Sequence, residues 1–227
     1  MDKIIRDSKL AIAALFLVSC VSFADSHSMP PSLEAADFAA PLSDTVLSQH
    51  QTQLQQWIQS ELDMLGLGKI TSVAAPIPSA LIEFRQSWAK TDAEVAPFLG
   101  SWFRDWNLHP HDFMTVFPSK KLGQVCIIRT RRDMTQTVPF QEFTTPPEFS
   151  VAKVVEGQLL GTHTQSARSL LFPTPASEYL PYATQFLGTV EPNGNQRLYA
   201  AQNLPSIDPT WDSNIRQQLD TYGCISN

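Results

Sequence analysis

The sequence predicts an α+β protein in which N-terminal helices precede a small antiparallel β-meander or barrel-like domain that ends in a C-terminal helix. Apolar residues recur at helical spacing over residues 44–65 and again over 208–222. Between them, short β-rich segments alternate with turn residues. Of the 227 residues, 43% are hydrophobic and 10% aromatic, which is enough apolar material to form a core and excludes a wholly disordered chain.

The N-terminus has the features of an export signal. Lys3, Arg6 and Lys9 precede an apolar run from Leu10 to Ser19, and a basic start followed by about 7–15 apolar residues is typical of a signal peptide. The run is shorter than the ~20 residues that a membrane-spanning helix requires. We therefore predict a signal peptide over residues 1–19, followed by a flexible tether, rich in Ser, Ala and Pro, over residues 20–43.

Two sites compete for removal of this signal. The string Leu17-Val18-Ser19-Cys20 resembles the bacterial lipobox, which implies that Cys20 is acylated and anchors the mature chain at the outer-membrane face of the periplasm. Alternatively, cleavage after Ala24 removes residues 1–24 and releases a soluble periplasmic or secreted protein.

Cysteine usage agrees with export. Once Cys20 is assigned to the signal or the lipid, Cys126 and Cys224 remain as an even pair, and such pairs form disulfides in oxidising compartments. The alternative of a reactive Cys126 is weaker, because Val125 and Ile127 indicate a buried strand and apolar burial raises the pKa of a thiol.

Residues 44–95 are predicted to form a helical segment. Its first helix has an apolar stripe and an opposite face of glutamines, and Gly66 ends it. The stripe indicates core packing, with docking of a partner as the alternative. Residues 79–89 predict a second helix. The stripe of the first helix consists of Leu47, Leu54, Trp57, Ile58, Leu62 and Leu65.

Residues 96–227 are predicted to form the antiparallel β domain, with about six to eight strands in a closed or partly closed meander. The strongest hairpin signal is Asn193-Gly194. A C-terminal helix over 208–222 presents Trp211, Ile215 and Leu219 at helical spacing. The expected strands span 99–106, 113–117, 124–130, 149–155, 158–164, 185–190 and 196–201.

Two resemblances follow from short motifs. The Leu-Gly-x-Trp string that ends at Trp102, with Pro118-Ser119, Val125-Cys126 and Gly223-Cys224, resembles a group of uncharacterised cyanobacterial secreted proteins and lipoproteins. This resemblance implies a small β domain with paired cysteines and implies no activity. The Gly-x-Trp portion also resembles the opening strand of lipocalins, which implies a barrel-like shape.

Two clusters are candidate ligand or partner surfaces. Aromatic residues within twenty positions would line an apolar ligand pocket inside a small barrel, or simply form core. Basic residues would meet lipid headgroups, a polyanion or an acidic partner, or form a solvated hairpin edge. The aromatic residues are Phe98, Trp102, Phe103, Trp106, Phe113 and Phe117, and the basic residues are Lys120, Lys121, Arg129, Arg131 and Arg132.

His109 and His111 are weak candidates for metal ligands, because alternate residues of an extended segment point the same way. A metal site would need a further ligand such as Asp112 or His163, and a solvated loop is the stronger interpretation. We therefore predict no metal and no other cofactor.

The function expected from these features is binding or assembly at the cell envelope, by an exported and lipid-anchored protein without catalytic activity. Its expected partners are the membrane, through the lipid, and an envelope protein. A net charge of −6 disfavours nucleic acid as a partner, and no common catalytic motif is found. The alternatives are a lipocalin-like carrier of a small apolar ligand and, third, a metal-assisted hydrolase.

Overall fold

A computed structural model describes residues 32–64, 77–104, 111–132, 143–162, 168–172, 186–190, 195–209 and 211–226. The predicted signal peptide with Cys20, and also Trp106, His109 and the Asn193-Gly194 turn, lie outside the described residues.

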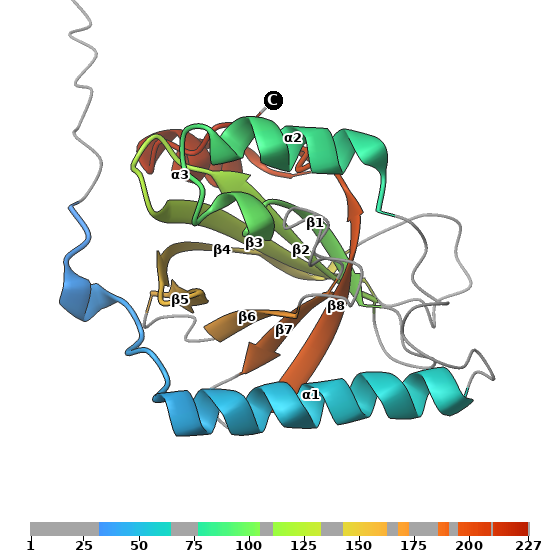
Figure 1. Cartoon of the computed structure of the whole chain (residues 1–227). Helices are drawn as coiled ribbons and strands as arrows, with labels where there is room; N and C mark the ends of the chain where they lie inside the picture. Colours follow the sequence, from blue (N-terminus) through green and yellow to red (C-terminus); the bar gives the residue numbers. More distant parts are fainter. Residues whose placement is uncertain are drawn as a thin grey trace, which may run out of the picture.

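The described strands form a closed antiparallel barrel in which each strand pairs with the next along the chain, and the last pairs with the first (Figure 1). This arrangement confirms the predicted α+β, barrel-like fold. The eight strands are β1 (Gly100–Arg104), β2 (His111–Pro118), β3 (Gln124–Arg132), β4 (Phe143–Val155), β5 (Gln158–Gly161), β6 (Arg168–Phe172), β7 (Phe186–Val190) and β8 (Gln196–Asn203).

Strand alternation divides the side chains between the barrel interior and its outer face. Trp102 lies opposite Met114 and Val116 lies opposite Ile127 in the strand register, and all four belong to one buried cluster. Leu187 and Tyr199, also paired, complete this cluster from the other side of the barrel. This cluster fills part of the barrel interior.

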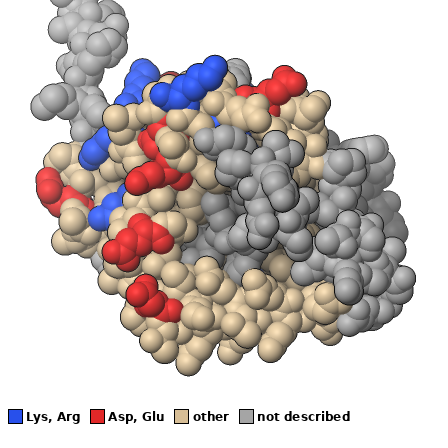
Figure 2. All heavy atoms as spheres, in the orientation of Figure 1, with Lys and Arg blue, Asp and Glu red and all other residues tan. Residues whose placement is uncertain are grey.

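Helix α1 (Asp44–Met64) covers the outer face of the last strands. Leu54 and Ile58 pack against Phe186, Val190 and Leu198, and Leu47 is partly buried beside them. These three residues of the predicted stripe are core, whereas Leu65 and the side chains of Trp57 and Leu62 lie outside the described part of the chain. The exposed side of α1 is rich in glutamine, and the corresponding side of the molecule is largely uncharged (Figure 2).

The segment just before α1 also contacts the barrel. Phe38 is buried and forms a β-bridge with Thr162. The last part of the predicted tether therefore packs against the barrel beside β5.

Helix α2 (Ser79–Ala89) and the short 3-10 helix η3 (Ala96–Phe98) cover the end of the barrel at which β1 begins, and α2 lies across the barrel from α1 (Figure 1). Phe84 and Trp88 pack against the interior cluster. Gly100 has φ +133°, and a Cβ there would lie 3.0 Å from Leu81 Cδ1. A glycine at this position therefore lets β1 start directly beneath α2. We call this end the α2 end.

Helix α3 (Ser213–Thr221) packs on the outer face of β3 and β4, where Ile215 and Leu219 join Ile128 and Phe149. The helix begins later than the predicted residue 208, because the Asp212 carboxylate caps it by accepting a hydrogen bond from the backbone N–H of Ile215.

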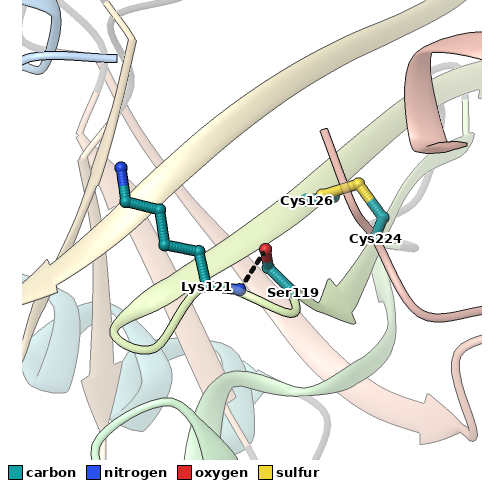
Figure 3. The surroundings of a disulfide bond; sticks show 4 residues. All are labelled: Ser119, Lys121, Cys126 and Cys224. Atoms are coloured by element: carbon teal, nitrogen blue, oxygen red, sulfur yellow. Dashed lines mark hydrogen bonds between the residues drawn. A yellow bond between two sulfur atoms is a disulfide. The ribbon is translucent and has the colours of Figure 1, made fainter. Parts of the chain in front are cut away.

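The predicted disulfide joins Cys126 of β3 to Cys224, with 5.9 Å between the Cα atoms (Figure 3). The residues around Cys224 also pair with the chain after β2, because Lys120 N–H donates to Gly223 O and Ile225 N–H donates to Pro118 O. The C-terminus is thus attached to the barrel both covalently and by backbone hydrogen bonds.

Candidate functional site: an arginine cluster inside the barrel

Charged residues gather inside the barrel at the end opposite α2. Arg104 ends β1, Asp112 lies beside it on β2, and Arg129 is on β3. Arg197 and Tyr199 come from β8. We call these five residues the arginine cluster.

The strand register places these side chains on the interior face. Arg104 pairs with Asp112, two positions along β1 from Trp102, and Tyr199 pairs with the interior residue Leu187. Since residues two apart on a strand share a face, Arg197 lies on the same face as Tyr199. Segments far apart in the sequence thus contribute to one site.

Asp112 is the centre of the cluster and is only 2% exposed. Arg129 Nε donates to Oδ1 at 3.1 Å and Arg129 Nη2 to Oδ2 at 2.9 Å. Arg197 Nη1 and the Tyr199 hydroxyl also donate to Oδ2, at 2.8 and 2.9 Å, while Arg129 Nη2 lies 2.8 Å from the Tyr199 hydroxyl oxygen. The carboxylate is therefore paired and hydrogen-bonded, as a buried charge must be.

This environment changes the pKa of two groups. Burial alone would raise the pKa of Asp112, but the hydrogen bond and charge of Arg129, aided by Tyr199 and Arg197, outweigh it and hold that pKa below the ordinary 3.8. Burial raises the pKa of Tyr199, and the Asp112 carboxylate adds to the rise. At neutral pH, Asp112 is therefore ionised and Tyr199 is a neutral hydrogen-bond donor.

Arg104 extends the cluster towards the barrel end. Its side chain is half-buried, and burial followed by the like charge of Arg197 lowers its pKa below the ordinary 12.5. An arginine nevertheless stays protonated in proteins. Three guanidinium groups, those of Arg104, Arg129 and Arg197, thus lie around the carboxylate of Asp112.

The α2 end of the interior is different in character. Trp102 is fully buried and its indole Nε1 donates to Phe98 O at 2.9 Å. The Arg85 guanidinium lies 4.9 Å from the centre of a Trp102 ring, and Arg85 Nε donates to Leu99 O at 2.8 Å. Burial lowers the pKa of Arg85 to about 9. The barrel interior therefore has an apolar zone, which α2 covers, and a polar zone at the opposite end of the barrel.

The predicted aromatic cluster divides between two faces. Phe98 and Trp102 belong to the interior cluster. Phe103 and Phe113 stack on the outer face with 4.7 Å between ring centroids, and Phe117 packs beneath α3. The described members of the aromatic cluster, which exclude Trp106, therefore do not line one pocket.

The predicted basic cluster also separates. Lys120 and Lys121 are exposed in the turn between β2 and β3 at the α2 end, whereas Arg129 points inward to Asp112. The structure describes only the backbone of Arg131 and Arg132, and likewise of His111. Among the described residues, no group of three His, Cys, Asp or Glu side chains is placed to bind a metal ion.

Sequence reasoning did not single out Arg104, Arg197 or Tyr199. A usable signal was present in β8, because Arg197 and Tyr199 alternate with the apolar Leu198 and Ala200. Recognising them as a site required knowledge of which strands are neighbours.

Comparison with known proteins adds no family assignment: no family model, no curated protein and no solved structure matches this chain. In the described part of the chain, none of the helices is long and apolar enough to cross a membrane.

Proposed function

We propose that this chain is an exported binding protein that takes up a small amphiphilic molecule at the arginine-cluster end of its barrel. The proposal favours the carrier interpretation over an assembly role. Export and attachment to the envelope through Cys20 are part of the same proposal.

The observation that supports it is the buried charge inside the barrel. An eight-stranded barrel has an interior that side chains fill or that one small ligand occupies. Burying Asp112 with Arg129 and Arg197 has a desolvation penalty that an apolar interior would avoid, and apolar replacement of buried ion pairs is often neutral or stabilising. A polar zone beside an apolar zone instead matches the composition of small-molecule sites.

The outer surface gives less support to assembly through an apolar patch. Among the described residues, the large hydrophobic side chains that are exposed are Val46, Leu122 and Leu204. They come from α1, the turn before β3 and the segment after β8, so they are dispersed, and scattered exposed apolar residues are normal on a protein surface.

The test uses the mature chain, from Cys20 replaced by Ser to Asn227, produced with its disulfide formed. It is titrated with the neutral fluorescent probe N-phenyl-1-naphthylamine. We expect saturable binding of one probe per chain, and displacement of the probe by dodecanol. Probe fluorescence that rises without saturation, or that dodecanol leaves unchanged, would overturn the carrier function.

A further inference from the structure

We infer that Thr189 is a specificity-determining residue of the binding site inside the barrel, and that its hydroxyl donates a hydrogen bond to an oxygen of the ligand. This oxygen belongs to an alcohol or a carbonyl group at the polar end of the amphiphile. The assignment rests on the proposed function and names the chemical group that the site recognises.

Thr189 lies on the interior face of the barrel. Leu187, two positions before it on β7, belongs to the interior cluster, and residues two apart on a strand share a face. Phe186 and Val190, at the alternate positions, pack against α1 on the outer face. The Thr189 side chain therefore points into the barrel.

The strand register places Thr189 where the apolar and polar zones of the interior meet. Leu187 lies opposite Tyr199, and both belong to the interior cluster. Thr189 lies opposite Arg197, one step further along β7 towards the polar end. An amphiphile that occupies both zones would therefore place its polar group beside Thr189.

The Thr189 hydroxyl is buried without a partner. The residue is only 2% exposed, and its Oγ1 atom has no hydrogen-bond partner among the residues that the structure describes. A buried hydroxyl in this state is costly, because it has lost its hydrogen bonds to water and gained none in return. Valine has nearly the same shape and would avoid this penalty. A ligand oxygen that supplies the missing partner explains why a threonine stands here.

The surroundings of Thr189 favour a hydrogen-bond acceptor as the ligand group. The guanidinium of Arg197 has N–H donors and no acceptor, and the Thr189 hydroxyl can itself donate one hydrogen bond. A ligand N–H directed at this pair would meet the donors of Arg197, whereas an oxygen would not. This preference holds whichever other groups Arg197 binds and whatever the charge of the site, because a guanidinium never offers an acceptor.

The first test is the stability of the unliganded protein. Thr189→Val removes the hydroxyl and keeps the β-branched shape of the side chain. Because the hydroxyl has no partner within the described protein, the urea midpoint of the variant should equal or exceed that of the wild type. A lower midpoint would show that the hydroxyl stabilises the unliganded fold, and would overturn the inference.

The second test is displacement of N-phenyl-1-naphthylamine, a probe without an oxygen, from the mature oxidised chain at pH 7.5. Thr189→Val should change the Kd of the probe less than about twofold. The affinities of dodecanol and dodecan-2-one should both fall about tenfold, because the oxygen of each ligand loses its donor. Thr189→Ser keeps the hydroxyl and should recover most of both affinities.

Thr115→Val is the matched control. Thr115 is also a buried threonine in a strand, at 7% exposure, and its hydroxyl lies 3.4 Å from that of Ser101. It alternates along β2 with Met114 and Val116 of the interior cluster, so it faces outward. This variant should leave the affinities for the probe, dodecanol and dodecan-2-one unchanged.

The outcomes distinguish the inference from the proposed function. Equal dodecanol affinity of the wild type and Thr189→Val would overturn the inference and leave the carrier function standing. A loss for dodecanol without a loss for dodecan-2-one would also overturn it, because Thr189 would then accept the hydrogen bond. An equal loss for the probe and both ligands would show a structural role for Thr189 and would contradict the inference. If neither the probe nor dodecanol binds the wild type, the proposed function itself fails.

Discussion

Replacement of Asp112 by Asn tests the arginine cluster as a buried ionic network. The substitution keeps the size of the side chain and removes its charge. Because Oδ2 accepts from Arg129, Arg197 and Tyr199 and Asp112 is 2% exposed, both guanidinium groups would lose a buried counter-ion that they share.

The expected loss of stability follows from this geometry. Removing one partner of a buried ion pair costs about 3–5 kcal/mol. The Arg129 and Arg197 side chains are 16% and 20% exposed, so water moderates the penalty, and we expect about 2–4 kcal/mol. With a urea m-value of about 2 kcal/mol/M, the unfolding midpoint should fall by about 1–2 M.

The assay is equilibrium urea unfolding at pH 7, followed by tryptophan fluorescence, with Asp220→Asn as the matched control. Asp220 is exposed near the end of α3, and its replacement should change stability by less than about 0.5 kcal/mol. A midpoint for Asp112→Asn within error of the wild type would refute the ionic network.

The pH dependence of the free energy of unfolding tests the same ionic network. The pKa of Asp112 is held below its ordinary 3.8 in the folded protein, so ionised Asp112 stabilises the fold above that value. This stability is lost as the pH falls below 3.8 and through the lower folded pKa. The wild type should therefore lose stability more steeply than Asp112→Asn in this acid range, and parallel curves would contradict the assignment.

Three further outcomes are expected. Replacing Cys126 and Cys224 together by Ala should destabilise the oxidised protein by about 4–5 kcal/mol, because the bridge closes a loop with a sequence separation of 98; a urea midpoint equal to that of the wild type would contradict this. Gly100→Ala should cost about 1–3 kcal/mol, because φ is +133° and Leu81 lies close, again measured by urea unfolding. Cys20→Ala should move the protein from the membrane to the soluble fraction of its host, and intact mass spectrometry should show the acyl mass lost; a wild-type chain that begins at Asp25 would contradict lipidation.

Local patterns predicted much of the fold. The spacing of Leu54 and Ile58 identified the face of α1 that packs on the barrel, and most strands followed from β-rich runs between turn residues. The disulfide was predicted because Cys126 and Cys224 are the cysteines that remain once Cys20 is assigned to the signal or the lipid. Each of these features depends on residues near one another in the sequence, or on a pair with no alternative partner.

Two strand predictions were incomplete for physical reasons. The short strand β6 (Arg168–Phe172) was not expected, and it is stabilised by pairing with β5 and β7 rather than by its own composition. Strand β4 begins at Phe143 rather than 149 and includes Pro146-Pro147. Proline removes a donor from the strand ladder, and the pairing of β3 with β4 shifts register near this point.

The arginine cluster was the least predictable feature. Arg197 and Asp112 are 85 residues apart and on strands that are not neighbours in the barrel. Their contact depends on closure of the barrel between β1 and β8, and on the register of each intervening pair. Charged residues in strands otherwise indicate an exposed edge, which is why Arg129 was grouped with the surface lysines.

The most direct test of the account is a crystal structure of the mature, oxidised chain with N-phenyl-1-naphthylamine bound. The account predicts that the probe lies inside the barrel, at the end where the arginine cluster lies. A probe bound only on the outer face of the barrel would contradict the account.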